Sequence, residues 1–459
     1  MLLNLLIETD RSHLIHPVSS WTGHEARGVT VLQSGEGVYL TDAAGHRLLD
    51  GFAGLWCVNV GYGQQSIVDA ATEQMARLPY ATGYFGFGSE PAILLAAKLA
   101  EVAPGDLDHV YFTLGGSDAV DSAVRFIRYH ANVTGRPHKK HMIALERGYH
   151  GSTSTGAGLT ALPAFHANFD VPLPFQHHIP APYPYRDGSD GDGEASIAMS
   201  VAALRAKVEA LGAENVAAFF CEPIQGSGGV IVPPVGWLKA IRALCTELDI
   251  LMVADEVITG FGRTGPMFAC EAEGVAPDIM TMAKGLTSGY SPMGAVLLSD
   301  RIYRAIADNT QGGASIGHGF TYSGHPVSAA VGLEVMRLYQ EGGVLANGQK
   351  VGAYFGQKLA ALADHPLVGD VRSRGMLAGV ELVVDKASKA KPAPALGLPD
   401  HLARTGYANG LIFRAFTDGI VGFAPPLICT EADIDLLIER FTKTLDAVLD
   451  IKEIRNAVD

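Results

Sequence analysis

Clustered basic residues and long apolar runs are both scarce in this sequence, and each shortage excludes a class of protein. Lysine and arginine total 34 against 48 acidic residues, which gives a formal net charge of −14. Nucleic-acid binding depends on clustered cations that neutralise phosphates, so we expect no nucleic-acid partner. The apolar start, residues 1–7, has no basic residues before it and is followed by Glu8 and Asp10. It is too short for a signal peptide or a membrane span, and we expect no membrane partner.

Paired cysteines are also missing. The five cysteines show no C-x-x-C spacing; they are Cys57, Cys221, Cys245, Cys270 and Cys429. An odd number scattered through apolar segments is typical of reduced, buried thiols, so we expect a cytoplasmic protein. His138 and His141 could ligate a metal, but a solvated basic turn is the stronger interpretation, and the sequence predicts no metal site.

Alternating apolar runs and helical periodicity predict the fold class. Strand-like runs are seen at 110–113, 142–145, 216–221 and 251–254, with a helical pattern at 118–130. This alternation predicts a large α/β domain, residues 66–340, with a mostly parallel sheet and crossover helices.

The two ends of the chain have a different pattern. A hairpin is expected at 38–50, and short strands at 371–384 and 411–423 lie between helices expected at 344–363 and 432–449. We therefore expect a smaller α+β domain, residues 341–459, which also includes the N-terminal segment 1–65.

A carboxylate and a lysine end two of the buried runs. Asp255 follows the apolar run 250–254, and Lys284 follows 278–283. Ligands of open α/β sheets bind at the carboxyl ends of strands. Pyridoxal phosphate needs an amine for a Schiff base and a carboxylate that keeps its ring nitrogen protonated. Burial would lower the lysine pKa and free the amine, although the pair alone is equally compatible with ordinary strand ends.

Two further strand ends carry residues suited to a cofactor. Gly116 and Ser117 follow the run 110–113 and open a helix, so their N–H groups and the Ser117 hydroxyl suit a phosphate, although Ser is also an ordinary helix cap. Tyr149 follows the run 142–145, where an aromatic ring could stack on a flat cofactor. A lone tyrosine is more often a packing residue.

An ordered set of short motifs extends over nearly the whole chain. The motifs are Gly115-Gly116-Ser117, Tyr149-His150-Gly151, Glu222-Pro223-Ile224-Gln225-Gly226, residues 255–265, Ala283-Lys284-Gly285 and residues 318–326. Each is weakly specific, but in this order and spacing they strongly resemble the class III (ω-type) aminotransferases. That resemblance implies fold type I, pyridoxal phosphate as cofactor, and a homodimer with shared active sites. A tetramer stays open.

The resemblance implies a role for each matching residue. Lys284 would hold the cofactor as a Schiff base and move the substrate proton, and Asp255 would pair with the ring nitrogen. Further cofactor contacts are implied for Gly116, Ser117, Tyr149, Glu222, Val257 and Thr321, with Thr321 reaching the phosphate of the neighbouring subunit.

Residues 54–63 are similar to the ω-amine:pyruvate transaminases within this class. The implied substrate pocket consists of Trp56, Tyr84, Phe85, Tyr149, Ser227 and Arg414, and segments 16–21 and 416–421 would line its donor side. Arg414 would swing in to bind a carboxylate and out for apolar groups, a role that suits a planar guanidinium. An interface or surface arginine is the alternative interpretation.

The resemblance therefore implies ping-pong transfer from an amine or ω-amino acid donor to a small keto acid such as pyruvate. An aminomutase needs the same Lys284 and Asp255 and stays open, as does an acceptor such as 2-oxoglutarate. A cofactor-binding regulator without turnover would usually carry a fused DNA-binding domain. The residues before the hairpin are too few to form one.

Overall fold

A seven-stranded sheet forms the centre of the computed structural model, which describes residues 2–458. Its order is β4 (His109–Thr113), β10 (Gly294–Leu298), β9 (Ile279–Met282), β8 (Leu251–Asp255), β7 (Val216–Cys221), β5 (His141–Leu145) and β6 (Gln176–Ile179). The pairs from β9 through β6 are parallel, whereas β10 is antiparallel to both neighbours. The predicted mostly parallel sheet is confirmed.

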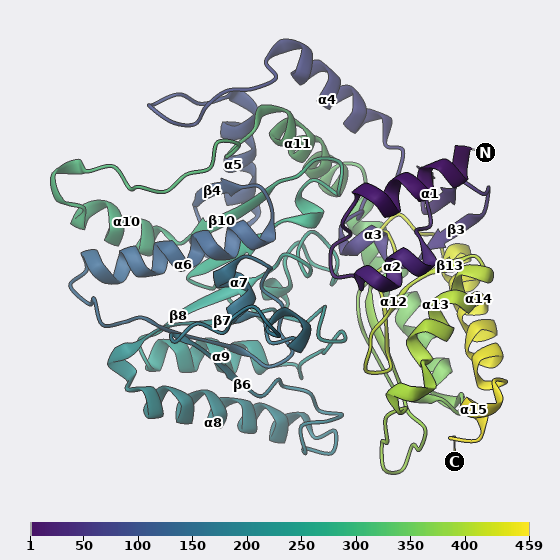
Figure 1. Ribbon diagram of the computed structural model, residues 1–459. Coiled ribbons are helices and arrows are strands. Elements are labelled where there is room, and N and C mark those ends of the chain that lie inside the picture. Colours follow the sequence, from purple (N-terminus) through teal and green to yellow (C-terminus); the bar gives the residue numbers. More distant parts are fainter. Residues whose placement is uncertain (1, 459) are drawn as a thin grey trace.

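Helices cover both faces of this sheet (Figure 1). Along β8, Val253 packs in the apolar cluster that includes α6 (Gly116–Val133), while Met252 and Ala254 pack in the cluster on the other face. Every residue of β7 to β10 is buried, as expected for strands covered on both sides. The other helices of this region are α4 (Gln65–Arg77), α5 (Glu90–Val102), α7 (Ser154–Leu159), α8 (Gly193–Leu211), α9 (Trp237–Glu247), α10 (Asp300–Asn309) and α11 (Pro326–Gln340).

The C-terminal part contains a second, antiparallel sheet. Its order is β11 (Val368–Arg374), β12 (Leu377–Leu382), β15 (Ile420–Phe423) and β14 (Arg414–Ala415). The accompanying helices are α12 (Val344–Ala360), α13 (Leu398–Ala408), α14 (Glu431–Leu449) and α15 (Lys452–Arg455). The helices predicted at 344–363 and 432–449 correspond to α12 and α14.

The N-terminal segment lies beside this C-terminal part (Figure 1). The predicted hairpin is formed by β2 (Tyr39–Asp42) and β3 (Arg47–Asp50), with β1 (Leu32–Glu36) added on one edge. On the other edge β3 pairs in parallel with β13 (Leu411–Ile412). Helices α1 (Leu2–His13), α2 (Trp21–Arg27) and α3 (Ala53–Trp56) complete the segment. The domain boundaries near residues 65 and 340 stay a prediction.

A separate group of apolar side chains, the junction cluster, joins these parts. It consists of Phe52, Trp56, Ile224, Val230, Ile258, Leu377, Phe416, Ile420 and Ala424. Its members come from the N-terminal segment, from the loops after β7 and β8, and from the C-terminal sheet. The cluster therefore places one face of Trp56 against the C-terminal part, beside the carboxyl edge of the central sheet.

A buried arginine connects the same three parts by hydrogen bonds. Arg263 is fully buried and donates to Asn59 Oδ1 at 2.6 Å and to the carbonyl oxygens of Pro425 at 2.6 Å and Met376 at 3.1 Å. Burial lowers its pKa to about 10, which still leaves the guanidinium charged at neutral pH.

None of the helices in residues 2–458 is long and apolar enough to cross a membrane.

Replacing Arg263 with leucine should destabilise the fold. The substitution leaves three buried acceptors without their donor, and each unsatisfied group costs about 1–3 kcal/mol, so we expect a loss of at least about 3 kcal/mol. Urea denaturation of the cofactor-free protein measures this loss. Arg304→Leu, at a side chain that is 53% exposed, is the matched control and should change stability by less than about 0.5 kcal/mol. Equal stabilities of the two variants would contradict the assignment.

Candidate active site

The predicted site residues come together at one edge of the central sheet. The parallel strands end at this edge, where open α/β sheets bind their ligands. The residues that follow the strands are Gly116 and Ser117 after β4, Tyr149 and His150 after β5, Glu222 after β7, Asp255 at the end of β8, and Lys284 after β9.

The Asp255 carboxylate is buried and held by a histidine. His150 Nδ1 lies 2.8 Å from Asp255 Oδ2, and the Val257 N–H donates to Asp255 Oδ1 at 3.2 Å. Burial opposes the charging of His150, but the hydrogen bond to Asp255 and the nearby carboxylates outweigh it and raise the pKa of His150. These two contacts, one to each carboxylate oxygen, therefore fix the orientation of the Asp255 side chain.

Glu222 orients the loop that carries Tyr149. Its side chain is buried and accepts hydrogen bonds from the Tyr149 N–H and the Gly226 N–H, each at 2.9 Å. Burial is the largest influence on this carboxyl group and raises the pKa of Glu222 to about 7. A group with this pKa exchanges its proton near neutral pH.

Lys284 occupies a turn with unusual backbone geometry. It begins the short 3-10 helix η4 (Lys284–Leu286) with φ +41°, which is uncommon for a residue with a side chain and is found at functional sites. Loss of solvent around the amine lowers the pKa of Lys284, although Asp255 and Glu222 act in the opposite direction. The amine lies 5.5 Å from the centre of the Trp56 ring. Its lowered pKa favours the uncharged, nucleophilic form.

Two glycines allow neighbouring loops to approach the start of α6 closely. A side chain at Gly116 would lie 3.0 Å from Val257, and one at Gly151, where φ is +122°, would lie 2.8 Å from Ser117 Oγ. The Ser152 N–H donates to Ser117 Oγ at 3.2 Å. Glycine at these two positions therefore keeps Ser117 and Val257 close to the neighbouring loops.

Aromatic rings extend from the lysine towards Arg414. The Trp56 ring lies 4.4 Å from the Phe52 ring and 6.5 Å from the Phe416 ring, and the Arg414 guanidinium lies 5.6 Å from the Phe416 ring. Trp56 and Phe416 are buried, whereas Arg414 is exposed. Segment 416–421, which was expected to line the donor side, thus begins beside Trp56.

Three predicted residues lie on an exposed face instead. Phe85 is 89% exposed, Tyr84 and Thr321 are also exposed, and a side chain at Gly319 would overlap the Tyr84 hydroxyl. Tyr84 and Phe85 therefore lie beside the segment that contains Thr321. Within the described residues, neither Tyr84 nor Phe85 makes a ring contact or a hydrogen bond with Trp56 or Lys284. Ser227 is half-buried in the loop after β7.

Sequence reasoning missed several residues of this site. His150 lies within the quoted Tyr149-His150-Gly151 motif, but no role was inferred for it. Phe416 lies in a segment that was named only as a whole. Arg147 donates to the Gly228 carbonyl at 2.9 and 2.6 Å and to Asp418 at 2.5 Å, and so connects the loop of Ser227 to segment 416–421. Local sequence carries no signal for that last contact.

The residues at this edge fit pyridoxal phosphate. A buried carboxylate lies at one strand end and a buried amine at the next, and the N-terminus of α6 with Ser117 provides donors for a phosphate. His150 Nε2 and Trp56 Nε1 are buried and have no hydrogen-bond partner within residues 2–458. Buried polar atoms of this kind are expected to face a bound group.

Comparison with known proteins identifies the family. The family model for class-III aminotransferases matches residues 22–445. Putrescine–pyruvate aminotransferase of Pseudomonas aeruginosa is 43% identical over 437 residues, covering 95% of this chain and 94% of that protein. Diaminobutyrate–2-oxoglutarate transaminase of Halomonas elongata is 39% identical, covering 97% and 96%. The crystal structure of an (S)-enantioselective ω-transaminase from Thermomicrobium roseum superposes with a TM-score of 0.94 at 42% identity, covering 97% and 99%. The predicted family, fold class and cofactor are thereby confirmed, and the chain belongs to the class III aminotransferases, pyridoxal-phosphate enzymes of fold type I.

Proposed function

We propose that this aminotransferase takes its amino group from an amine or ω-amino acid and transfers it to a small keto acid such as pyruvate. The observation that carries the proposal is the row of apolar rings, from Trp56 to Phe416, that ends at Arg414. Such a pocket accepts an apolar donor and offers one cation to a carboxylate. The similarity to a putrescine–pyruvate aminotransferase supports the same choice.

The bound cofactor would supply an electron sink for the bond broken at the substrate Cα. Asp255, oriented by His150, would hold a proton on the ring nitrogen. Gly116 and Ser117 would bind the phosphate, while Val257 and Tyr149 would flank the ring. Glu222 would set the position of Tyr149 through the Tyr149 N–H.

Lys284 would move the proton at the substrate Cα. Burial lowers the pKa of its amine and so favours the uncharged form, which can accept that proton and return it. The junction cluster lies beside this amine through Trp56 and would exclude water from the reacting atoms. Exclusion of water strengthens the attraction between Asp255 and a protonated ring.

Arg414 is suited to a substrate carboxylate because its charge is not already neutralised. Within residues 2–458 its guanidinium has no ion pair and no hydrogen-bond partner. Arg147 also contacts segment 416–421, but its guanidinium is already paired with Asp418 of that segment. One free cation favours a keto acid with a single carboxylate over 2-oxoglutarate, the acceptor named for the Halomonas relative.

We further propose that the enzyme works as a cytoplasmic homodimer with shared sites. Residues 80–94 and 316–322 expose several large apolar side chains, among them Phe85 at 89%, Phe87 at 67%, Ile93 at 63% and Tyr322 at 55%. An apolar face of this kind is typical of a subunit interface. It would bring Thr321, Tyr84 and Phe85 to the partner's site. The five free thiols support a reducing compartment.

The first prediction from this proposed function is that Lys284 carries the cofactor. Borohydride should attach the cofactor to the peptide that contains Lys284, and the purified enzyme should absorb visible light. Lys284→Ala should abolish the attachment and slow amino transfer by at least about 100-fold, since a positioned acid–base group contributes about that much. Lys98→Ala, at a partly exposed side chain of α5 that pairs with Glu101, is the control. Attachment at another lysine would refute the assignment.

The second prediction concerns the acceptor. Arg414→Ala should raise the KM for pyruvate at least about tenfold, equivalent to about 1.4 kcal/mol, because the carboxylate loses its charge partner. The half-reaction with an arylalkylamine that carries no carboxylate should change by less than about threefold, a difference of under about 0.7 kcal/mol. Exposed Arg404→Ala is the control. Equal losses in both half-reactions would indicate a structural role, and unchanged pyruvate kinetics would place the carboxylate site elsewhere.

The third prediction tests the shared site. Thr321→Ala should release cofactor on dialysis, because a hydrogen bond to a charged group is worth about 1.5–3 kcal/mol, whereas Thr321→Ser should retain it. Mixed dimers of Lys284→Ala and Thr321→Ala subunits show whether Thr321 acts across the interface or within its own subunit. If Thr321 acts across the interface, each mixed dimer keeps one intact site with wild-type cofactor affinity. If that site shows the weakened affinity of Thr321→Ala, the residue acts within its own subunit.

A further inference from the structure

The first two helices have little apolar packing of their own. Helix α2 contains no buried residue, and no described side chain of α1 is fully buried. Leu5 is 62% exposed, and between the helices Ile15 and Val18 are each 71% exposed. Short pieces that lack a core are commonly held by a staple such as a metal ion. The closed arrangement of α1 and α2 therefore depends on polar contacts.

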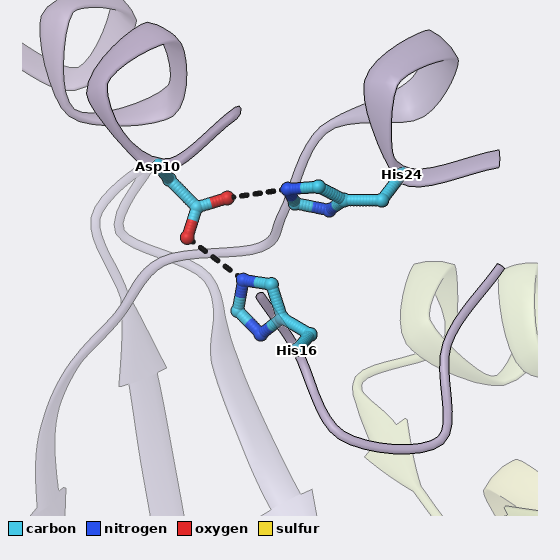
Figure 2. Close-up of side chains that lie close together, drawn as sticks. All are labelled: Asp10, His16 and His24. Atoms are coloured by element: carbon cyan, nitrogen blue, oxygen red, sulfur yellow. Dashed lines mark hydrogen bonds and ion pairs between the residues drawn. The ribbon is translucent and has the colours of Figure 1, made fainter. Parts of the chain in front are cut away.

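Those contacts converge on one carboxylate (Figure 2). Asp10 lies near the end of α1, His16 in the loop that follows, and His24 in α2. His16 Nε2 lies 2.8 Å from Asp10 Oδ1, and His24 Nε2 lies 2.9 Å from Asp10 Oδ2. All three potential ligand atoms lie within 4.8 Å of one another.

The hydrogen bonding of this cluster is incomplete. Asp10 Oδ2 and His24 Nε2 are buried and lie 2.9 Å apart in an ion-pair contact, but this contact lacks hydrogen-bond geometry, and neither atom has another hydrogen-bond partner within residues 2–458. Buried polar atoms in native proteins are almost always paired. A cation that both atoms ligate would satisfy them together.

We propose that Asp10, His16 and His24 bind a divalent transition-metal ion of the zinc type. Imidazole nitrogens and a carboxylate oxygen are ligands that zinc prefers. Ligand atoms about 2.1 Å from a tetrahedral ion lie about 3.4 Å apart, so the two contacts need to widen only slightly. The nearby Arg11 guanidinium is paired with Glu8 at 2.7 Å, which reduces its repulsion of a cation. Water would occupy the remaining coordination position.

The ion would connect three successive pieces of chain. It joins α1, the loop and α2, and it would hold the loop that leads to Trp21, whose side chain is 66% exposed at the start of α2. Segment 16–21 is the one expected to line the donor side of the pocket. Although His16 belongs to that segment, the tests below measure metal binding and proteolysis and do not depend on the reaction.

Zinc titration of the untagged, cofactor-loaded enzyme tests the proposal after prior treatment with a chelator. Calorimetry should show one ion per subunit. Asp10→Asn, His16→Ala and His24→Ala should each weaken binding at least about tenfold, because changes even in residues that only support a ligand cost 10–100-fold. His13→Ala, at an exposed histidine of α1 outside the cluster, is the matched control and should bind as wild type does.

A second measurement reports on the segment itself. Zinc should slow tryptic cleavage after Arg27 several-fold in the wild type and in His13→Ala, but not in His24→Ala. His141 Nδ1 lies 2.8 Å from His177 Nε2, so His141→Ala shows whether that pair competes for the ion. Absence of stoichiometric binding overturns the proposal. So does binding that survives all three cluster substitutions, or binding that leaves cleavage after Arg27 unchanged.

Discussion

The buried carboxylate of Asp255 is the group on which the arrangement of the site depends. An ionised carboxylate inside a protein is costly unless charged and hydrogen-bonding partners surround it. His150 meets this requirement and thereby determines where the Tyr149-His150-Gly151 segment lies. Glu222 holds the same segment through the Tyr149 N–H, and Gly151 lies against Ser117 at the start of α6. One buried carboxylate thus links the end of β8 to the start of α6, where we propose that the phosphate binds.

The substrate side follows a different physical rule, since it is built from apolar contacts between distant parts of the chain. The junction cluster places Trp56 between the large sheet and the C-terminal sheet, and Arg263 fixes the same parts by hydrogen bonds. Arg414 lies at the outer end of these rings, where its guanidinium is 5.6 Å from the Phe416 ring and has no ion pair or hydrogen bond within the described residues. The proposed substrate pocket therefore rests on this junction, whereas the residues proposed for the shared chemistry surround Asp255 and Lys284.

Some of the residues implied for the substrate pocket lie apart from the others in the single chain. Tyr84, Phe85 and Thr321 lie on an exposed apolar face and not beside Trp56. The N-terminal helices are likewise weakly packed and are closed by the Asp10 cluster. Both features lie in segments for which we propose a further partner, a second subunit for the first and a metal ion for the second. The central sheet does not depend on these segments, because the chain's own helices cover both of its faces.

The sequence by itself determined the elements that depend on local pattern. Apolar runs predicted the strands before Asp255 and Lys284, and helical periodicity predicted α12 and α14, because burial imposes a short repeat on neighbouring residues. The tertiary structure decided what joins distant residues. His150 reaches Asp255 across 105 positions, Trp56 packs against Phe416, and β13 pairs with β3. The antiparallel direction of β10 was likewise decided by the tertiary structure. Periodicity shows which residues are buried, but not which surfaces bury them, because strand order and packing partners are properties of the folded chain.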